Sequence, residues 1–500
     1  MNEMISQATV YDVAEVSPLH SAKLLTKKLN NNISLKREDQ QSVFSFKLRG
    51  AYNKISHLSA EQKAAGIIAA SAGNHAQGVA LSAQRLKLSA QIVMPVTTPT
   101  IKVDSVREMG AEVVLCGDNY DEACTHAYKV AKESHREFIH PYDDLEVIAG
   151  QGTIGKELLE QYQGKIDAIF IPVGGGGLIA GVAAWIKQHS PTTKIIGVEP
   201  EDAATLYAAL AAGKRVELPQ VGIFADGVAV KQIGSNTFKI AEKCVDEVIL
   251  VSIDELCAAI KDIFDDTRVV SEPAGALAVA GIKKYVQREN CNDQNLIAIN
   301  SGANINFDRL RHVTERTELG EGREGLFAVT IPEQKGSFLK FCEIIGGHSI
   351  SEFNYRYSTP EEAHIFVGIK FSNAVTEKNA LIQMLSKHDY PVTDLSDNEM
   401  AKLHVRHMVG GRCPQLKEEL LYRFEFPERP GALLQFLKLM GSQWNISLFH
   451  YRNHGAAYGR VLVGAQVPEV DRPEFIKFLD ELGYTYYDES DNPIYSLFLQ

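Results

Sequence analysis

The sequence predicts an α/β fold with parallel sheets over residues 33–300, followed by a duplicated α+β domain. Two observations lead to this prediction. Short β-branched runs alternate with longer amphipathic segments in the first part, a pattern typical of a parallel sheet that helices cover on both faces. In the second part, two long segments repeat each other. Ligands of parallel sheets bind at the carboxyl ends of the strands, so the loops after these strands are the first places to search.

The candidate strands are short apolar runs, and the candidate helices lie between them. Strands are predicted at residues 66–70, 90–95, 112–116, 168–173, 195–199 and 296–300. Helices are predicted at residues 75–86, 119–135, 151–163, 178–189, 253–266 and 272–289. Residues 302–323 are charged and show no strand pattern, so they are expected to form a partly helical connection.

An internal repeat fills the C-terminal part of the chain. The segment L-F-A-V-T-I-P-E-Q-K-G-S-F-L-K-F from Leu326 matches L-Y-R-F-E-F-P-E-R-P-G-A-L-L-Q-F from Leu421. I-S-E-F-N-Y-R at 350–356 then matches I-S-L-F-H-Y-R at 446–452. Each copy predicts a βαββαβ-like order with a glycine turn after the first strand. Neither copy holds a clustered nucleophile and base, so it is either a scaffold for oligomerisation or a regulatory ligand-binding domain.

Composition and charge narrow the class of protein. The 500 residues are 45% hydrophobic and 23% charged, as in ordinary soluble globular proteins. A formal net charge of −12 offers no surface potential for nucleic acid or an anionic membrane. The seven cysteines form no C-x-x-C pair, which favours reduced thiols in a cytoplasmic protein over disulfides or zinc. No signal-peptide pattern is visible, and Pro172 and four glycines interrupt the uncharged stretch 168–186, so no membrane span is expected.

One lysine stands where a helix is expected to begin. The motif V-F-S-F-K-L-R-G-A-Y places Lys47 where an extended run with Phe44 and Phe46 turns into a helix. The positive end of the helix and the apolar neighbours both favour a neutral amine, which Schiff-base chemistry requires. Taken alone, however, the motif favours an ordinary solvated lysine.

The segment S-A-G-N-H-A-Q-G at 71–78 lies between a predicted strand and a predicted helix. Ser71, Gly73, Asn74 and His75 would present backbone N–H groups at the helix N-terminus, which suits a carboxylate ligand. The alternative is a glycine turn with an asparagine cap. His75 is expected to be structural rather than a general base.

Two further loops follow predicted strands. Four consecutive glycines at 174–177 and then Leu178 lie between a strand and a helix, where successive N–H groups can converge on a phosphate. The loop is neither a Walker A motif nor a G-x-G-x-x-G, and a bare flexible loop is the alternative. In N-S-G-A-N at 300–304, Ser301 follows the last strand, either as a cap or as a hydrogen-bond donor to a ligand.

Together, S-F-K-L-R-G-A, S-A-G-N-H-A-Q-G, V-G-G-G-G-L and S-G-A-N resemble, in this order, the motifs of the fold-type II pyridoxal-phosphate enzymes. The repeat resembles paired ACT-like regulatory domains, so the resemblance covers essentially the whole chain. It is closest to the biosynthetic threonine ammonia-lyases, or threonine dehydratases, through P-E-x-x-G-[SA]-x-L, F-N-Y-R and G-Y-x-x-x-D-E-S. The resemblance implies a two-lobed catalytic domain at 1–310, a linker at 311–324, and ACT-like domains at 325–397 and 419–492.

The resemblance also implies roles for single residues. Lys47 corresponds to the lysine that forms a Schiff base with pyridoxal phosphate, Asn74 to the asparagine at the cofactor's 3′ oxygen, and Ser301 to the residue at its pyridine nitrogen. The implied phosphate cup is Gly174, Gly175, Gly176, Gly177 and Leu178. The implied substrate loop is Ser71, Ala72, Gly73 and His75. Ala72 departs from the S-S-G-N-H frequent in the family, which matters little if backbone N–H groups make the contact.

The implied reaction is the α,β-elimination of L-threonine to 2-oxobutanoate and ammonia, the first step of isoleucine biosynthesis. Lys47 would remove the Cα proton while the cofactor ring takes up the negative charge. A serine at the pyridine nitrogen leaves that nitrogen largely unprotonated, which suppresses transamination. Either Lys47 or the cofactor phosphate would protonate the leaving hydroxyl.

The resemblance further implies inhibition by isoleucine, relief by valine, and a homotetramer in the cytoplasm. The candidate effector residues are Phe353, Tyr355, Arg356, Phe449, Tyr451 and Arg452. The alternative for these six residues is cross-strand packing on one sheet face. No metal, nucleic acid or membrane partner is expected.

Two other functions remain as alternatives. Serine dehydration, serine racemisation or β-replacement by sulfide would use the same Lys47 and glycine loop, although those activities normally belong to shorter chains. A non-catalytic amino-acid sensor would keep the catalytic half as a ligand-binding scaffold, and the intact lysine argues against it.

Overall fold

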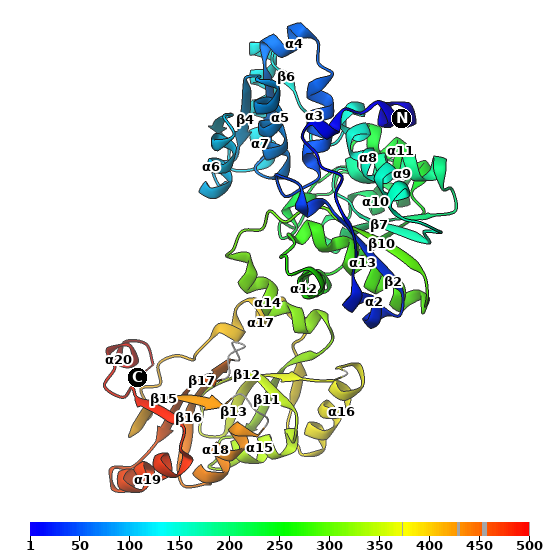
Figure 1. Ribbon diagram of the computed structural model, residues 1–500. Helices are drawn as coiled ribbons and strands as arrows, with labels where there is room; N and C mark the ends of the chain where they lie inside the picture. Colours follow the sequence, from blue (N-terminus) through cyan, green and yellow to red (C-terminus); the bar gives the residue numbers. More distant parts are fainter. Residues whose placement is uncertain (373, 428–430, 453–457, 500) are drawn as a thin grey trace. The chain divides into compact units, whose positions relative to one another are not determined.

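The structure is a computed structural model that describes residues 1–372, 374–427, 431–452 and 458–499. The chain forms two compact units, Met1–Gly320 and Glu321–Gln500. Figure 1 shows the first unit in blue to green and the second in yellow-green to red. The first unit is an α/β domain with two sheets, and the second is built on one antiparallel sheet. No helix in the described part of the chain is long and apolar enough to cross a membrane.

The larger sheet of the first unit has the strand order β1-β2-β10-β7-β8-β9. Its neighbouring strands run parallel, except that β1 pairs antiparallel with β2. The strands are β1 (Leu19–Ser21), β2 (Asn32–Arg37), β7 (Ala168–Pro172), β8 (Lys194–Pro200), β9 (Glu247–Val251) and β10 (Asn295–Asn300). The helices around it are α1 (Asn2–Gln7), α2 (Lys23–Leu29), α8 (Leu145–Gln161), α9 (Gly177–His189), α10 (Thr205–Ala212), α11 (Ser235–Cys244), α12 (Ile253–Thr267), α13 (Pro273–Glu289) and α14 (Arg309–Gly320).

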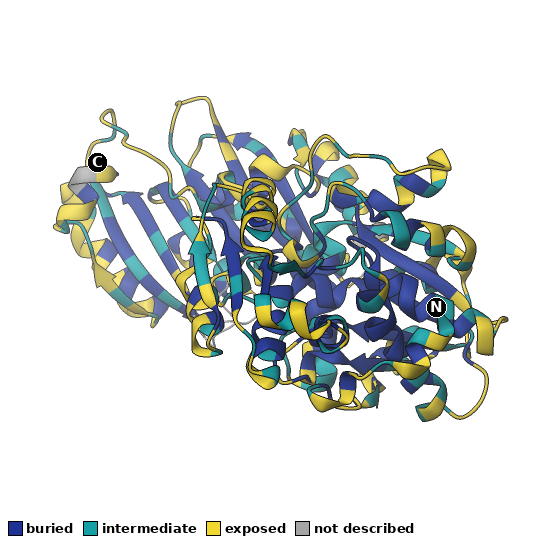
Figure 2. Cartoon of the chain, turned by 90° about the horizontal axis from the view of Figure 1, so that it is seen from above, coloured by how far each residue is buried: buried dark blue, intermediate teal, exposed yellow. Residues whose placement is uncertain are grey.

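Helices cover both faces of this sheet. Alternate side chains of β7 pack against helices on opposite faces. Phe170 packs into a core that includes residues of α12 and α13. Ile169 and Ile171 face the opposite way, into a core that includes residues of α8 and α9. Figure 2, coloured by burial, shows many buried strands, with most exposed residues on the outer surfaces of helices and in loops.

The smaller sheet of the first unit is parallel throughout, in the order β5-β4-β3-β6. Its strands are β3 (Ile67–Ala70), β4 (Ala90–Met94), β5 (Glu112–Leu115) and β6 (Glu137–Phe138). The helices of this lobe are α4 (Ala60–Ala65), α5 (Asn74–Leu86), α6 (Thr100–Glu108) and α7 (Tyr120–Ser134). The helix α3 (Lys47–Ser56) packs against α5 of this lobe and against α8 of the larger one. The predicted two-lobed fold with parallel sheets is confirmed.

Every strand and helix predicted for the first unit is present, with two local corrections. The helix predicted to begin at residue 151 begins at Leu145, because the Asp144 side chain accepts hydrogen bonds from the backbone N–H groups of Glu146 and Val147. The prediction of an extended run before Lys47 is wrong, since Phe44 has a φ of 55°. The sequence analysis also missed four strands and six shorter helices of this unit, which are β1, β2, β6, β9, α1, α2, α4, α6, α10 and α11.

The second unit contains a sheet in the order β14-β11-β13-β12-β16-β17-β15-β18. Its described strands are β11 (Glu324–Pro332), β12 (Ser349–Arg356), β13 (Glu362–Lys370), β14 (Val392–Asp394), β15 (Glu419–Pro427), β16 (Asn445–Arg452), β17 (Tyr458–Gln466) and β18 (Thr485–Asp488). Its described helices are α15 (Ser337–Ile345), α16 (Ala374–Lys387), α17 (Glu399–Leu403), α18 (Ala432–Met440), α19 (Arg472–Leu482) and α20 (Pro493–Phe498). Each copy of the repeat therefore has the predicted βαββαβ order.

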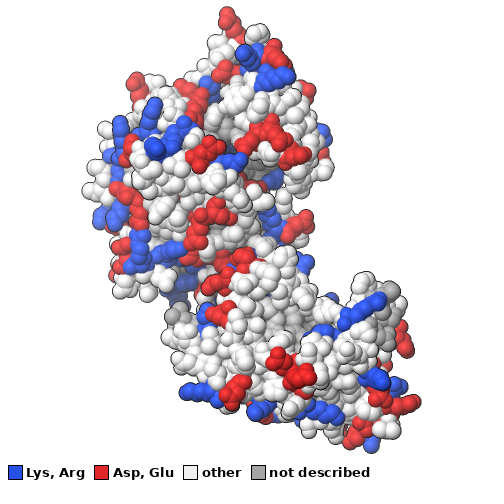
Figure 3. Space-filling model, turned by 180° about the vertical axis from the view of Figure 1, so that it is seen from behind, with Lys and Arg blue, Asp and Glu red and all other residues white. Residues whose placement is uncertain are grey.

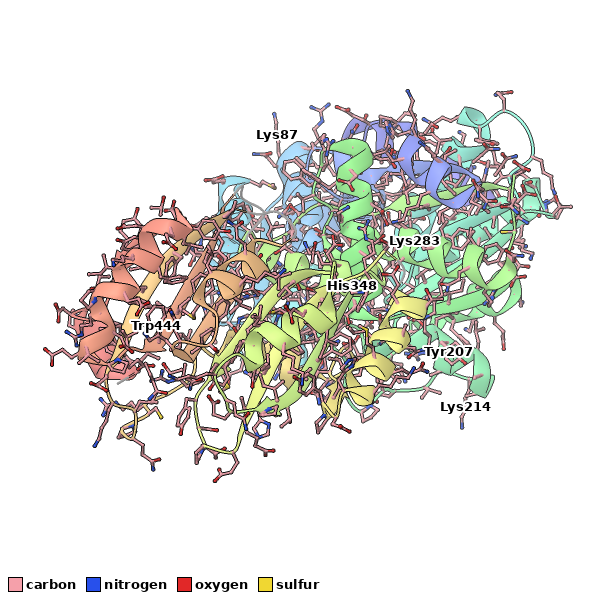
Figure 4. The ribbon with its side chains drawn as sticks, turned by 90° about the horizontal axis from the view of Figure 1, so that it is seen from below. Lys87, Tyr207, Lys214, Lys283, His348 and Trp444 are labelled. Carbon is pink, nitrogen blue, oxygen red and sulfur yellow. The ribbon has the colours of Figure 1, made fainter. Side chains whose placement is uncertain are left out.

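The two copies join through the antiparallel pair β12 and β16, where Tyr355 lies opposite Phe449. An aromatic core lies between the sheet and the helices, and the Phe353 and Phe449 rings are 5.3 Å apart in it. Trp444, labelled in Figure 4, packs edge-on against Phe475 in the same core. This packing holds the duplicated domain together as one continuous sheet.

Candidate active site

A cavity in the first unit gathers residues from motifs that are far apart in the sequence. It lies at the carboxyl ends of β7 and β10, beside the start of α3. Its lining consists of Phe46, Lys47, Asn74, Tyr142, Pro172, Gly174, Gly175, Gly176, Gly177, Leu178, Gly227, Val228, Glu272, Ala274 and Ser301. The structure thus brings the lysine, the asparagine, the glycine loop and the serine of the sequence prediction to one place.

Lys47 is the first residue of α3, and its side chain lines the cavity. Its Nζ donates a hydrogen bond to the carbonyl oxygen of Pro141 at 3.2 Å and lies 5.3 Å from the centre of the Phe46 ring. Burial lowers the pKa of Lys47 to about 8, and the nearby charge of Glu272 opposes that shift. Lys47 therefore has a much larger neutral fraction near neutral pH than an exposed lysine.

The glycine loop is shaped by close neighbours that leave no room for side chains. A Cβ on Gly175 would lie 2.2 Å from ring carbons of Tyr142, and one on Gly174 would lie 2.8 Å from the Cα of Val228. Gly176 has a φ of +90°, which strongly favours glycine, and α9 begins at the next residue. Backbone N–H groups at a helix N-terminus suit a phosphate, so this loop fits the phosphate of pyridoxal phosphate.

Asn74, the first residue of α5, is held by two partners that the sequence analysis missed. Its Nδ2 donates to Glu272 Oε1 at 2.7 Å, and its Oδ1 accepts from Asn304 Nδ2 at 2.6 Å. Burial and the charge of Asp226 raise the pKa of Glu272 to about 7. Asn304 ends the N-S-G-A-N motif, but the sequence analysis gave it no role. No motif marks Glu272, and the one available signal for it is its place before Pro273 at the start of a predicted helix.

The predicted substrate loop lies at the start of α5, and its residues differ in their surroundings. The Ser71 hydroxyl accepts a hydrogen bond from the Gly73 N–H at 3.2 Å. His75 is buried, and its Nε2 lies 2.8 Å from the carbonyl oxygen of Ile139. Burial and the charge of Lys47 lower the pKa of His75 to about 3, so the ring is neutral and suits the structural role expected for it. Ser71, Ala72, Gly73 and His75 are not among the described residues that line the cavity.

Ser301 directly follows β10 and is almost fully buried at the cavity wall. The backbone on both sides of it is fixed: Ser301 O accepts from Phe46 N at 3.3 Å, and Gly302 forms a bridge with Ser45. These contacts tie the serine to the segment that leads into Lys47. The pair of loops therefore forms one wall of the cavity.

A second cavity lies within the second unit, between the two copies of the repeat. It is lined by Cys342, Ile345, Gly346, His348, Ser349, Ile350, Lys370, Phe426, Pro427, Gly431, Ala432, Leu433, Leu434, Phe449, Tyr451 and Val461. His348, labelled in Figure 4, is one of the lining residues and lies in the chain between α15 and β12. The lining is mainly apolar, with Lys370 at the end of β13 as its one lysine among the described residues.

The six effector candidates of the sequence analysis are spread over different surroundings. Phe449 and Tyr451 line the second cavity. Phe353 and Tyr355 are buried in the aromatic core instead. Arg356 pairs with Glu419, and Arg452 lies 3.7 Å from Glu352.

Charged side chains outside the sites are mixed in sign. Figure 3 shows lysine, arginine, aspartate and glutamate interspersed over the face it presents. Within the described residues, no group of three or more His, Cys, Asp or Glu side chains is placed to hold a metal ion. The lining of the first cavity offers a lysine, hydrogen-bonding side chains and a glycine loop to a ligand.

The comparison with known proteins agrees with these two units. Residues 10–302 match the family of pyridoxal-phosphate-dependent enzymes, and residues 315–405 and 410–499 match the C-terminal regulatory domain of threonine dehydratase. The chain is 55% identical to a biosynthetic L-threonine dehydratase of Burkholderia multivorans, covering 99% of this chain and 98% of the relative. It is 54% identical to the biosynthetic L-threonine dehydratase of Escherichia coli, covering 99% and 96%.

Solved structures resemble the catalytic unit. The processed form of threonine deaminase isoform 2 from Solanum lycopersicum has a TM-score of 0.62 and 52% identity, covering 63% of this chain and 91% of that chain. Maize serine racemase has a TM-score of 0.59 and 31% identity, covering 63% and 96%. With a matching catalytic fold, a matching regulatory half and full-length relatives, the chain belongs to the pyridoxal-phosphate-dependent enzymes and, within them, to the threonine dehydratase family.

Proposed function

We propose that this chain is a lyase, a threonine ammonia-lyase that converts L-threonine into 2-oxobutanoate and ammonia in the first step of isoleucine biosynthesis. The observation that carries the proposal is the convergence of Lys47, Asn74, the glycine loop and Ser301 on one cavity. The identity to biosynthetic threonine dehydratases along nearly the whole chain supports threonine as the substrate.

When bound, pyridoxal phosphate supplies an electron sink for the charge that develops at Cα of the amino acid. The residues of this chain hold it at three points. The N–H groups at the start of α9 would bind its phosphate, Asn74 would bind its 3′ oxygen, and Ser301 would offer its hydroxyl to the ring nitrogen. A neutral hydroxyl there leaves the nitrogen largely unprotonated, which disfavours transamination.

Lys47 is the base that takes the Cα proton. A pKa of about 8 leaves a useful fraction of neutral amine near neutral pH, and a base works best when its pKa lies near the working pH. Once it holds the proton, the ammonium is stabilised by the nearby charge of Glu272. The leaving hydroxyl then takes a proton from Lys47 or from the cofactor phosphate.

The loop at the start of α5 receives the substrate carboxylate. Its backbone N–H groups stand at the positive end of a helix, which favours an anion. The hydrogen bond between His75 and Ile139 anchors the loop, because the neutral ring can donate from Nε2 to that carbonyl. The proposed substrate residues remain Ser71, Ala72, Gly73 and His75.

The experiment is an assay of the purified chain for 2-oxoacid and ammonia release from threonine and from serine. We expect release from threonine, and we expect Lys47→Ala to abolish turnover and the visible absorbance of the bound cofactor together. Turnover retained by Lys47→Ala would contradict the proposal. Faster turnover of serine, racemisation, or product formation only with added sulfide would favour another activity of this fold.

The non-catalytic sensor is a separate alternative. A sensor would bind threonine at the same cavity without releasing a product. Isotope exchange at Cα without release of 2-oxobutanoate would favour it, so the same reaction mixtures should be followed in deuterated water.

We further propose that isoleucine inhibits the enzyme and valine counteracts it by binding the cavity between the two copies of the repeat. The apolar side chains of Ile350, Leu433 and Val461 suit a branched aliphatic side chain, and Lys370 suits a carboxylate. Phe449 and Tyr451 are the earlier effector candidates that reach this cavity. An effector acts only through a difference in its affinity for two states of the enzyme.

The effector site is tested with Lys370→Met, which keeps the aliphatic stem and removes the charge. The isoleucine concentration for half-inhibition should rise by at least about tenfold, as expected for the loss of one charge-assisted contact. The matched control is Lys387→Met, a lysine in the last turn of α16 that is exposed. Unchanged inhibition in Lys370→Met would place the effector elsewhere.

A homotetramer and a cytoplasmic location complete the proposed function. The seven cysteines are all free thiols, which supports a reducing compartment. Light scattering on the purified chain tests the oligomeric state, and a mass other than that of four chains would contradict it.

A further inference from the structure

Glu272 is a buried carboxylate whose position is unusual for the residue that precedes a helix. It is the N-cap residue of α13, yet its side chain does not cap that helix. Instead, the side chain reaches into the cavity, where it is 4% exposed. Oε1 accepts from Asn74 Nδ2 at 2.7 Å, and Oε2 accepts from the Asn304 backbone N–H at 3.1 Å.

The hydrogen bonds around Asn74 fix which way its amide points. Asn304 Nδ2 donates both to Asn74 Oδ1 at 2.6 Å and to the carbonyl oxygen of Val43 at 2.9 Å. Because Oδ1 faces a donor and Nδ2 faces the Glu272 carboxylate, the amide has one consistent orientation. Nδ2 carries two N–H bonds, and the geometry directs one of them to Glu272.

We propose that Glu272 is a positioning residue, which orients Asn74 so that its second N–H is held toward the bound cofactor. This inference rests on the proposed function, since it concerns the same cavity. In its ionised form, which prevails above a pKa of about 7, the carboxylate accepts a stronger hydrogen bond than a neutral group does, so it also polarises the Asn74 amide. The charged groups that act on Glu272 are Asp226, Lys102 and the amine of Lys47.

The geometry predicts the effect of replacing the Glu272 carboxylate with an amide. In Glu272→Gln, the oxygen can still accept from Asn74, but the new NH2 group then faces the Asn304 N–H, a contact between two donors. The reverse orientation sets the NH2 group against Asn74 Nδ2. One of the two hydrogen bonds is therefore lost in either orientation, whereas Glu272→Ala loses both.

The test measures pyridoxal phosphate binding rather than activity alone. The cofactor is titrated into cofactor-free wild type, Glu272→Gln, Glu272→Ala and Asn74→Ala, and both the dissociation constant and the visible absorbance band are recorded. We expect Glu272→Gln to weaken binding by at least about tenfold and to shift the band, with a larger effect in Glu272→Ala. In the double variant of Glu272→Gln with Asn74→Ala, the two losses should be markedly less than additive, because Glu272 acts through Asn74.

The matched control is Asp262→Asn on α12, which also converts a buried carboxylate into an amide. Asp262 pairs with Lys28 at 2.8 Å and with Lys283 at 2.6 Å, and Lys283 is labelled in Figure 4. It lies outside the cavity, so this variant should change thermal stability without changing cofactor affinity or the absorbance band.

Two results would overturn the inference. One is a folded Glu272→Gln variant with the wild-type dissociation constant and absorbance band. The other is full additivity with Asn74→Ala. The experiment measures cofactor binding, so it tests the role of Glu272 even if wild type releases no 2-oxobutanoate from threonine. Failure of the proposed function would therefore be seen separately. If Glu272→Ala does not fold, the isosteric variant Glu272→Gln alone tests the inference.

Discussion

The Arg49 guanidinium lies 2.6 Å from the Glu157 carboxylate, and neither side chain has any exposed surface. Arg49 stands two residues after Lys47 on α3, whereas Glu157 belongs to α8. The same guanidinium also pairs with Glu38 at 2.8 Å, and Lys36 pairs with Glu157 at 2.6 Å. Two positive and two negative groups thus balance each other in the interior, and they tie the helix that carries Lys47 to the larger lobe.

The first prediction concerns this buried network. Arg49→Met leaves two buried carboxylates with Lys36 as their remaining cation, so we expect the free energy of unfolding to fall by about 3–5 kcal/mol. The measurement is urea unfolding followed by fluorescence. The chain has two tryptophans, so a Trp444→Phe background leaves Trp185 to report on the first unit.

An exposed ion pair serves as the control for that experiment. Lys129 and Glu133 lie 4.0 Å apart with side chains 71% and 63% exposed. Lys129→Met should change stability by less than about 1 kcal/mol. Equal effects of the two substitutions would mean that the buried network does not hold α3 in place.

The second prediction concerns the glycine loop. In Gly175→Ala the added Cβ would lie 2.2 Å from ring carbons of Tyr142, so the loop must shift and its N–H groups leave their positions. We expect pyridoxal phosphate to bind at least about tenfold more weakly, as judged by absorbance titration. Adding Tyr142→Ala should restore part of the affinity, because it removes the clashing ring.

Gly411→Ala is the control for the loop variant, since nothing lies within 4 Å of a Cβ at that position. It should leave cofactor affinity unchanged. If Gly175→Ala also binds the cofactor as wild type does, the glycine loop is not the phosphate site.

The third prediction concerns the pH at which Lys47 reacts. Only the neutral amine attacks the aldehyde of pyridoxal phosphate, and the neutral fraction rises with pH through the pKa. With a Lys47 pKa of about 8, the rate of appearance of the visible band in cofactor-free protein should reach half of its maximum near pH 8 and level off about one pH unit above that. The same reaction with Nα-acetyl-lysine corrects for titration of the cofactor. A protein rate that continued to rise toward pH 10 would show that burial does not lower this pKa.

The fourth prediction concerns Glu199, a buried carboxyl at the end of β8 whose oxygens accept hydrogen bonds from the N–H groups of Leu206 and Tyr207. Burial raises the pKa of Glu199 from 4.5 to about 7. A raised pKa means that the folded state binds the proton more tightly, so this contribution to stability is complete below pH 4.5 and is lost as pH rises through 7.

Its measurement is the difference in unfolding free energy between wild type and Glu199→Gln at several pH values. Between pH 5 and 8, wild type should lose about 3 kcal/mol relative to the variant, which has no proton to release at this site. A difference that is constant over this range would contradict the raised pKa.

The motifs around the cavity could be recognised in the sequence because each is local. The glycines at 174–177 lie between an apolar strand and an apolar helix, and the pattern of the flanking elements places them at a carboxyl edge. Phe44 could not be foreseen in the same way. Its positive φ is imposed by contacts with distant residues, including the Ser45–Gly302 bridge beside it.

The buried polar partners of Asn74 could not be predicted from the sequence either. Glu272 belongs to no quoted motif, and it meets Asn74 across a sequence separation of 198 residues. Asn304 belongs to the N-S-G-A-N motif, but nothing in that motif shows that its side chain contacts Asn74. The positions of the six effector candidates could not be predicted for the same reason. Strand alternation places Phe449 and Tyr451 on one face of a strand, but it does not show which of the six side chains lines a cavity and which lies in the core.

By itself, the sequence determined the alternation of strands and helices and the duplicated domain, because periodicity and glycine placement act over short stretches of chain. It singled out Lys47 only through the resemblance of four separate motifs to one family. Tertiary structure alone decided how the lysine is tuned and supported. Burial lowers the pKa of Lys47, and long-range hydrogen bonds orient Asn74 through Glu272. These effects depend on distances and desolvation that exist only after the two lobes have folded against each other.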